Sequence, residues 1–142
     1  MENLSSIEKN KKIILKYFYN LWNERNLEVL DEIISPNYIN HSPSIQNPEP
    51  GPNGLKPIIE EMFLGFPDLH YEILDLIATK NSVVTRLQVT GTHSAKIWGI
   101  DATGNKFNVS QMNIEYIKDG MITEHWRLTD ELLIMKQLGI VK

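Results

Sequence analysis

The spacing of hydrophobic residues along the chain changes near residue 68. Before that point apolar side chains recur every three or four residues, which is typical of amphipathic helices. The pattern predicts three helices, over residues up to 22 or 23, 27–35 and 55–65. Residues 38–41 are expected to be extended, and the proline-rich segment 42–54 is expected to be a loop.

After residue 68 apolar and polar residues alternate, which is the period of β-strands. Asp119-Gly120 is a strong hairpin-turn signal, and Asp75 falls opposite Arg86 in the preceding hairpin, where we expect a cross-strand ion pair. The pattern predicts two hairpins and a short final helix, over residues 69–78 with 82–93, 107–118 with 121–129, and 131–137.

Helices that precede paired antiparallel strands predict an α+β domain. The chain has 142 residues, a length that suits one hydrophobic core, so we expect a single domain over residues 1–142. The helices should cover one face of the sheet. A sheet that curls can then enclose a cavity between itself and the helices.

Composition narrows the functional classes. The net charge is -4, which argues against binding to nucleic acid or to an anionic membrane, because both need a basic face. The chain has no cysteine, which excludes thiolate chemistry and cysteine-based metal sites. Residues 1–12 are polar, and no apolar run is long enough to span a bilayer, so we expect a cytoplasmic protein.

In the second hairpin, placing Lys118 opposite Met121 fixes which residues share a face of the sheet. Asn113 then lies opposite Trp126, and Gln111 lies opposite Leu128. The surface that carries Asn113, Trp126, Leu128 and Asp130 mixes bulky apolar groups with a few polar ones, as a pocket does. The other surface is predicted to carry Met112, Ile114, Tyr116, His125 and Arg127.

The same register places Glu115 directly opposite Glu124, and like charges in that position are unfavourable. Either one of the two carboxylates reaches solvent or a cation at the open end of the pocket, or the register contains a bulge.

Three titratable residues are candidates for chemistry. Asp130, if it lies beside Trp126 in an apolar cavity, could exchange a proton near neutral pH, but an aspartate that precedes a helix also commonly caps it. His41 and His93 could polarise a carbonyl or shuttle a proton, or each could hold a loop. No metal site is predicted, because the sequence lacks the spacings of common metal-binding motifs.

Five segments, taken in order and spacing, resemble the SnoaL-like polyketide cyclase (ester cyclase) family of the nuclear-transport-factor-2-like superfamily. They span most of the chain: Tyr38-Ile39-Asn40-His41-Ser42-Pro43, Phe66-Pro67-Asp68-Leu69, Gly91-Thr92-His93 with residues 99–104, residues 119–130, and Gln137-Leu138-Gly139. The resemblance implies a cone-shaped fold, in which helices pack on a strongly curved antiparallel or mixed sheet around a pocket. It also implies a homodimer through the outer sheet face.

The resemblance further implies ring closure of a small hydrophobic carbonyl or aromatic compound by intramolecular aldol chemistry, without metal or organic cofactor. It gives the acid/base role to Asp130 and places His41 and His93 in the pocket. The alternatives are a non-catalytic carrier of a small ligand, an Asp/His hydrolase, and a dehydratase or isomerase of the same fold. Substrate contacts are predicted for seven residues: Trp126, Asn113, Tyr38, Met62, Phe63, Gln111 and Leu128.

Overall fold

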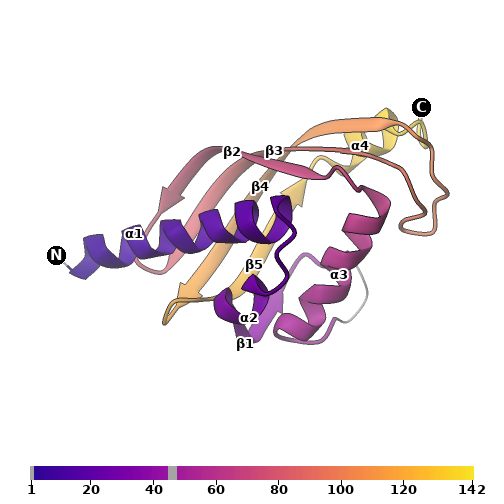
Figure 1. Ribbon diagram of the computed structural model, residues 1–142. Coiled ribbons are helices and arrows are strands. Elements are labelled where there is room, and N and C mark those ends of the chain that lie inside the picture. The colour runs from indigo at the N-terminus through magenta and orange to yellow at the C-terminus, as the bar shows by residue number, and fades with distance from the viewer. Residues whose placement is uncertain (1, 45–47) are drawn as a thin grey trace.

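The computed structural model describes residues 2–44 and 48–142 and has helices packed on one curled, five-stranded mixed sheet (Figure 1). The predicted α+β class is therefore confirmed. The helices and strands are α1 (Glu2–Leu15), η1 (Lys16–Asn23), α2 (Val29–Ile33), β1 (Ile34–Asn40), α3 (Pro52–Gly65), β2 (His70–Ala78), β3 (Ser82–Thr92), β4 (Lys106–Lys118), β5 (Met121–Thr129) and α4 (Glu131–Gln137).

The first predicted helix ends where expected, but its last two turns, η1, are π-helical. A π-helix closes hydrogen bonds between residues five apart, so Tyr17 and Trp22 share one buried face. The second helix is shorter than predicted because the chain enters β1 at Ile34. Pro36 is tolerated within β1 because this strand lies at the edge of the sheet. The third helix begins earlier than predicted, at Pro52, where proline fits the first helical turn.

The strands run in the order β1-β5-β4-β3-β2, with β1 parallel to β5 and the other neighbours antiparallel. Both predicted hairpins are present. Asp75 lies opposite Arg86 as predicted, but its carboxylate accepts a hydrogen bond from the backbone N–H of Leu76, and no ion pair with Arg86 is found in the described part of the chain.

The pairing of β4 with β5 contains a bulge that the sequence analysis did not assign. Ile117 lies opposite Ile122, but the next pair is Tyr116 with Glu124, so Thr123 is an extra residue in β5. Its hydroxyl donates to the carbonyl of Tyr116 at 3.2 Å. A slip of one residue turns every following side chain to the other face of the strand.

The predicted faces of β5 are therefore wrong beyond the bulge. Asn113 lies opposite Arg127 and not Trp126, while Met112 lies opposite Leu128. His125 and Arg127, which were predicted to face outward, lie on the inner side. Glu115 lies opposite His125, so the predicted encounter of two glutamates does not occur.

The helices cover the inner face of the sheet. Figure 1 shows α1 in front of the strands and α3 beside α2 and β1. Inner-facing residues of β4 are buried at every second position from Phe107 to Ile117. The aromatic face of η1 packs against β2, where Phe18 and Trp22 contact the ring of Tyr71. In the described part of the chain, no helix has the length and apolar character needed to cross a membrane.

Replacement of Trp22 by alanine tests this packing. Trp22 is 6% exposed and contacts the rings of Tyr17, Phe63 and Tyr71. We expect Trp22→Ala to lower the free energy of unfolding by about 3–5 kcal/mol, because a buried aromatic side chain is lost. Tyr19→Ala, on the exposed side of the same helix, should lower it by about 1 kcal/mol or less. Equal urea-unfolding midpoints for the two variants would contradict the assignment.

Candidate functional site

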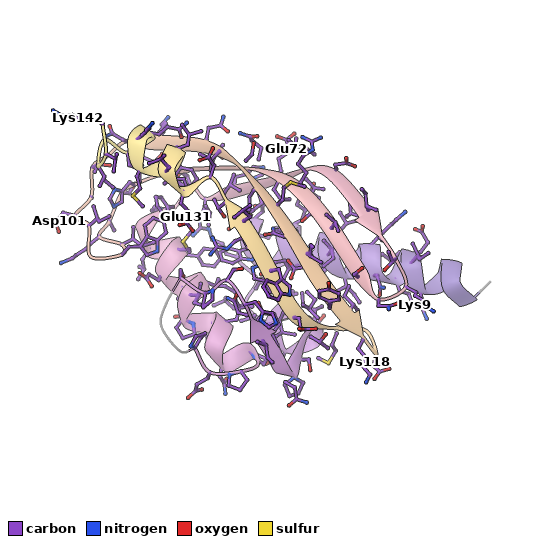
Figure 2. All side chains as sticks on the ribbon, turned by 180° about the vertical axis from the view of Figure 1, so that it is seen from behind. Lys9, Glu72, Asp101, Lys118, Glu131 and Lys142 are labelled. Carbon is purple, nitrogen blue, oxygen red and sulfur yellow. The ribbon has the colours of Figure 1, made fainter. Side chains whose placement is uncertain are left out.

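A cavity of about 410 Å³ lies between the inner face of the sheet and the helices. Most of its wall is aromatic or aliphatic, with Tyr17, Phe18 and Trp22 from η1 and Ile58 and Met62 from α3 among the lining residues. Polar side chains line it mainly from the end of β1, from β4 and β5, and from the start of α4: Asn40, Ser42, Ser44, Gln111, Asn113, His125, Arg127, Thr129 and Glu131. Figure 2, from the other side of the sheet, shows Glu131 where β5 passes into α4.

Glu115 and His125 form a buried pair on the inner face. Both carboxylate oxygens of Glu115 lie close to His125 Nδ1, at 2.9 and 2.8 Å, and Glu115 is fully buried. A carboxylate can only accept hydrogen bonds, so Nδ1 carries the proton of the imidazole. His125 lines the cavity, and Nε2 is the ring nitrogen that this contact leaves free.

A chain of hydrogen bonds runs along the polar wall from Ser42 to Asn113. Arg127 donates to the Ser42 carbonyl at 2.7 Å and to the Thr129 hydroxyl at 3.1 Å. Thr129 donates to Gln111 Oε1 at 3.0 Å, and Gln111 Nε2 donates to Asn113 Oδ1 at 3.2 Å. This series of hydrogen bonds ends at Asn113 Nδ2, a buried donor without a partner in the described part of the protein.

Two tyrosines add neutral donors to the cavity wall. Burial raises the pKa of Tyr17, and the nearby Glu115 carboxylate raises it further. Burial also raises the pKa of Tyr71. Both phenols therefore keep their protons throughout the physiological pH range and can act only as neutral hydrogen-bonding groups.

Three of the predicted substrate contacts, Gln111, Asn113 and Met62, do line the cavity. Tyr38 is buried, and its hydroxyl has no partner among the described residues. Phe63 packs against Trp22 at a ring separation of 5.7 Å and against the Arg25 guanidinium. Neither Tyr38 nor Phe63 is among the lining residues.

Trp126, Leu128 and His41 lie together on the outer side of the sheet. The bulge at Thr123 turns Trp126 and Leu128 outward, and Leu128 is 79% exposed. The His41 ring stacks on Trp126 at a centroid distance of 4.1 Å. Its Nε2 lies 2.9 Å from a Glu124 carboxylate oxygen. The expectation that Trp126 and Leu128 share a face with Asn113 is therefore wrong.

His93 and Asp130 also lie outside the cavity lining. His93 is fully buried, and its Nδ1 accepts a hydrogen bond from the Thr103 backbone N–H at 3.3 Å, so it holds the connection between β3 and β4. Asp130 is exposed and caps α4 by accepting a hydrogen bond from the Leu133 backbone N–H at 3.2 Å. The interpretation of Asp130 as a helix cap is thus confirmed, while its acid/base role stays a prediction.

Several residues that line the cavity were not predicted as site residues, and among them are His125 and Arg127. One signal in the sequence pointed to them, namely the unfavourable pairing of Glu115 with Glu124 in an unbulged hairpin. A bulge between these residues replaces that repulsion by the contact of Glu115 with His125. No cluster of three or more histidine, aspartate or glutamate side chains suited to a metal occurs among residues 2–44 and 48–142.

Comparison with protein families matches residues 12–138 to a model described as SnoaL-like polyketide cyclase. The chain is 28% identical over 112 residues to aklanonic acid methyl ester cyclase DauD from Streptomyces sp. strain C5. The matched residues cover 78% of this chain and 67% of that protein. The corresponding DnrD cyclase from Streptomyces peucetius is 27% identical over 109 residues, which cover 76% of this chain and 72% of the relative.

Solved structures show the same architecture. TsrD from Streptomyces laurentii superimposes with a TM-score of 0.81 at 28% identity, over 96% of this chain and 97% of that chain. Wild-type IdmH from Streptomyces antibioticus gives a TM-score of 0.77 at 30% identity, over 92% of this chain and 98% of that chain.

Proposed function

The chain belongs to the SnoaL-like polyketide cyclase family, and from this premise we propose that it closes a ring on a small hydrophobic carbonyl compound by acid/base chemistry without a cofactor. The observation that carries the proposal is the cavity under the sheet, whose apolar wall is interrupted by a polar strip, the hydrogen-bonded side chains that run from Ser42 to Asn113. Its volume of about 410 Å³ falls within the range of pockets for small organic ligands.

The proposed reaction starts with removal of a proton from a carbon flanked by carbonyl groups. The electron pair of that C–H bond moves to the carbonyl oxygen and gives an enolate. The enolate carbon attacks a second carbonyl of the same molecule, so a carbon–carbon bond forms, and the new alkoxide takes up a proton. Aromatic walls such as Trp22 would hold the folded substrate in reacting geometry and exclude water.

Arg127 and Asn113 are suited to stabilise the negative charge that develops on oxygen. Arg127 brings a positive charge to the cavity wall, and Asn113 brings a buried N–H donor that has no partner among the described residues. Donors that are fixed before the reaction stabilise an oxyanion without reorganising, which is commonly a large part of catalysis. The hydrogen-bond chain through Thr129 and Gln111 fixes both groups.

The test of this function uses aklanonic acid methyl ester, the ester named for two relatives of the chain. We expect the protein to convert it to a ring-closed isomer faster than buffer does, as followed by liquid chromatography with mass detection. Binding of the ester without any acceleration would contradict the cyclase proposal and support a ligand carrier.

The same assay tests the acid/base role that the family resemblance gives to Asp130. Asp130→Asn keeps the helix cap, since asparagine caps about as well as aspartate, and it removes the titrating group. If Asp130 is the acid/base residue, this variant should lose about 10²–10⁴-fold in rate. Full turnover by Asp130→Asn would exclude that role. The predicted pocket roles of His41 and His93 are tested in the same way by glutamine variants.

We also propose that the outer face of the sheet forms a homodimer. Met112, Trp126 and Leu128 leave large apolar side chains exposed side by side on β4 and β5. His125, which the sequence analysis counted in this surface, lies on the other face, and Trp126 and Leu128 replace it. Contiguous exposed apolar surface of this kind is typical of an interface.

Sedimentation equilibrium tests the dimer. We expect a dimer at micromolar concentration and a monomer for Leu128→Asp, because a charge would be buried in the interface. Leu64→Asp is the matched control, since Leu64 on α3 is 70% exposed and lies away from this face, so that variant should remain a dimer. A wild-type protein that sediments only as a monomer would contradict the proposal.

A further inference from the structure

Residues 2–44 and 48–142, which the structure describes, include two histidine–glutamate pairs, and only one of these two borders the cavity. His41 and Glu124 pair on the outer side of the sheet, with 27% and 43% of their side chains exposed. His125 and Glu115 pair on the inner side, with 7% and 0% exposed. The two pairs therefore share a chemistry but differ in access to a ligand in the cavity.

The buried pair has the form of an oriented base. Glu115 engages Nδ1 with both oxygens, which fixes the imidazole ring and its tautomer. Nε2 then carries the lone pair, and a carboxylate behind the ring stabilises the imidazolium that forms when Nε2 takes up a proton. Burial of a glutamate without a solvent contact is costly for folding, so stability alone does not account for a buried pair at the wall of the cavity.

We propose that His125 is the general base of the cavity and that Glu115 is its positioning residue. This inference deepens the function proposed above and rests on it. His125 Nε2 takes the proton from the substrate carbon, the C–H electron pair moves onto the adjacent carbonyl oxygen, and the imidazolium returns the proton to the alkoxide after ring closure. Arg127, two residues further along the same face of β5, lies where it can stabilise the enolate oxygen.

The other titratable groups near the pair do not compete for this role. Burial raises the pKa values of the phenols of Tyr17 on η1 and Tyr38 on β1, and the negative charge of Glu115 raises both further, so the two phenols remain protonated. The guanidinium of Arg127 has only N–H donors, so it cannot act as the base. Glu131 lines the cavity but is exposed at its end, at the start of α4.

The test uses 5-nitrobenzisoxazole, a small aromatic carbon acid that needs only a base. Removal of its C–H proton breaks the N–O bond and releases a coloured cyanophenolate. We expect wild-type protein to accelerate this elimination and His125→Gln to lose about 10²-fold or more of the acceleration. His70→Gln, at an exposed histidine of β2, is the matched control and should keep the wild-type rate.

Glu115→Gln tests the positioning role. It should lower kcat by about 10–10²-fold with little change in KM, because the neutral amide orients the ring less well and does not stabilise the imidazolium. The double variant Glu115→Gln/His125→Gln removes the buried charge together with its partner. It leaves no unpaired charge in the interior, so it serves as a control if a single variant fails to fold. Its rate should equal that of His125→Gln, since Glu115 acts through His125. Added imidazole should restore part of the rate of His125→Ala.

An elimination rate that is unchanged in His125→Gln, or that falls in His41→Gln and not in His125→Gln, would overturn the proposal. So would a wild-type protein no faster than buffer. The two proposals fail differently. Elimination that depends on His125, without ring closure of the polyketide ester, would overturn the cyclase function and support His125 as the base. Ring closure that is unchanged in His125→Gln would support the cyclase function and overturn the role of His125 as the base.

Discussion

The contact between Glu115 and His125 depends on one extra residue, Thr123, in the strand that carries the histidine. Side chains of a strand alternate between its two faces, so one inserted residue exchanges the faces of everything that follows it. Without the bulge, Glu115 would lie opposite Glu124 and the cavity wall would carry Trp126 and Leu128. With the bulge, His125 and Arg127 line the cavity, and Trp126 and Leu128 lie on the outer face of the sheet.

This exchange satisfies three physical demands together. The carboxylate of Glu115, which has no exposed surface, obtains a hydrogen-bonded partner and avoids a like charge. The guanidinium of Arg127 reaches Ser42 and Thr129, and thereby ties the segment after β1 to the end of β5. Trp126 and Leu128 become a surface that another molecule can cover. The polar strip of the cavity and the apolar outer face are two results of one local irregularity.

The sequence was sufficient to predict the α+β class, the two hairpins, the Asp75–Arg86 register and the family, because each depends on local spacing or on motif order. The helix cap at Asp130 was also predictable, since it depends only on the residues around it. The orientation of Trp126, Leu128, His125 and Arg127 was not. A bulge has no strong sequence signature. When the register is counted from the turn at Asp119-Gly120, a missed bulge places every later residue of β5 on the wrong face. Only the clash of Glu115 with Glu124 signalled it.

A fold does not by itself determine a reaction, so the chemistry of this protein has to be inferred from the side chains that face the cavity. Which residues face it is decided by the pairing of β4 with β5. The most direct measurement of that pairing is the set of cross-strand nuclear Overhauser effects between backbone protons in the labelled protein. We expect contacts of Asn113 with Arg127 and of Glu115 with His125. Contacts of Asn113 with Trp126 and of Glu115 with Glu124 would show an unbulged hairpin and contradict the account.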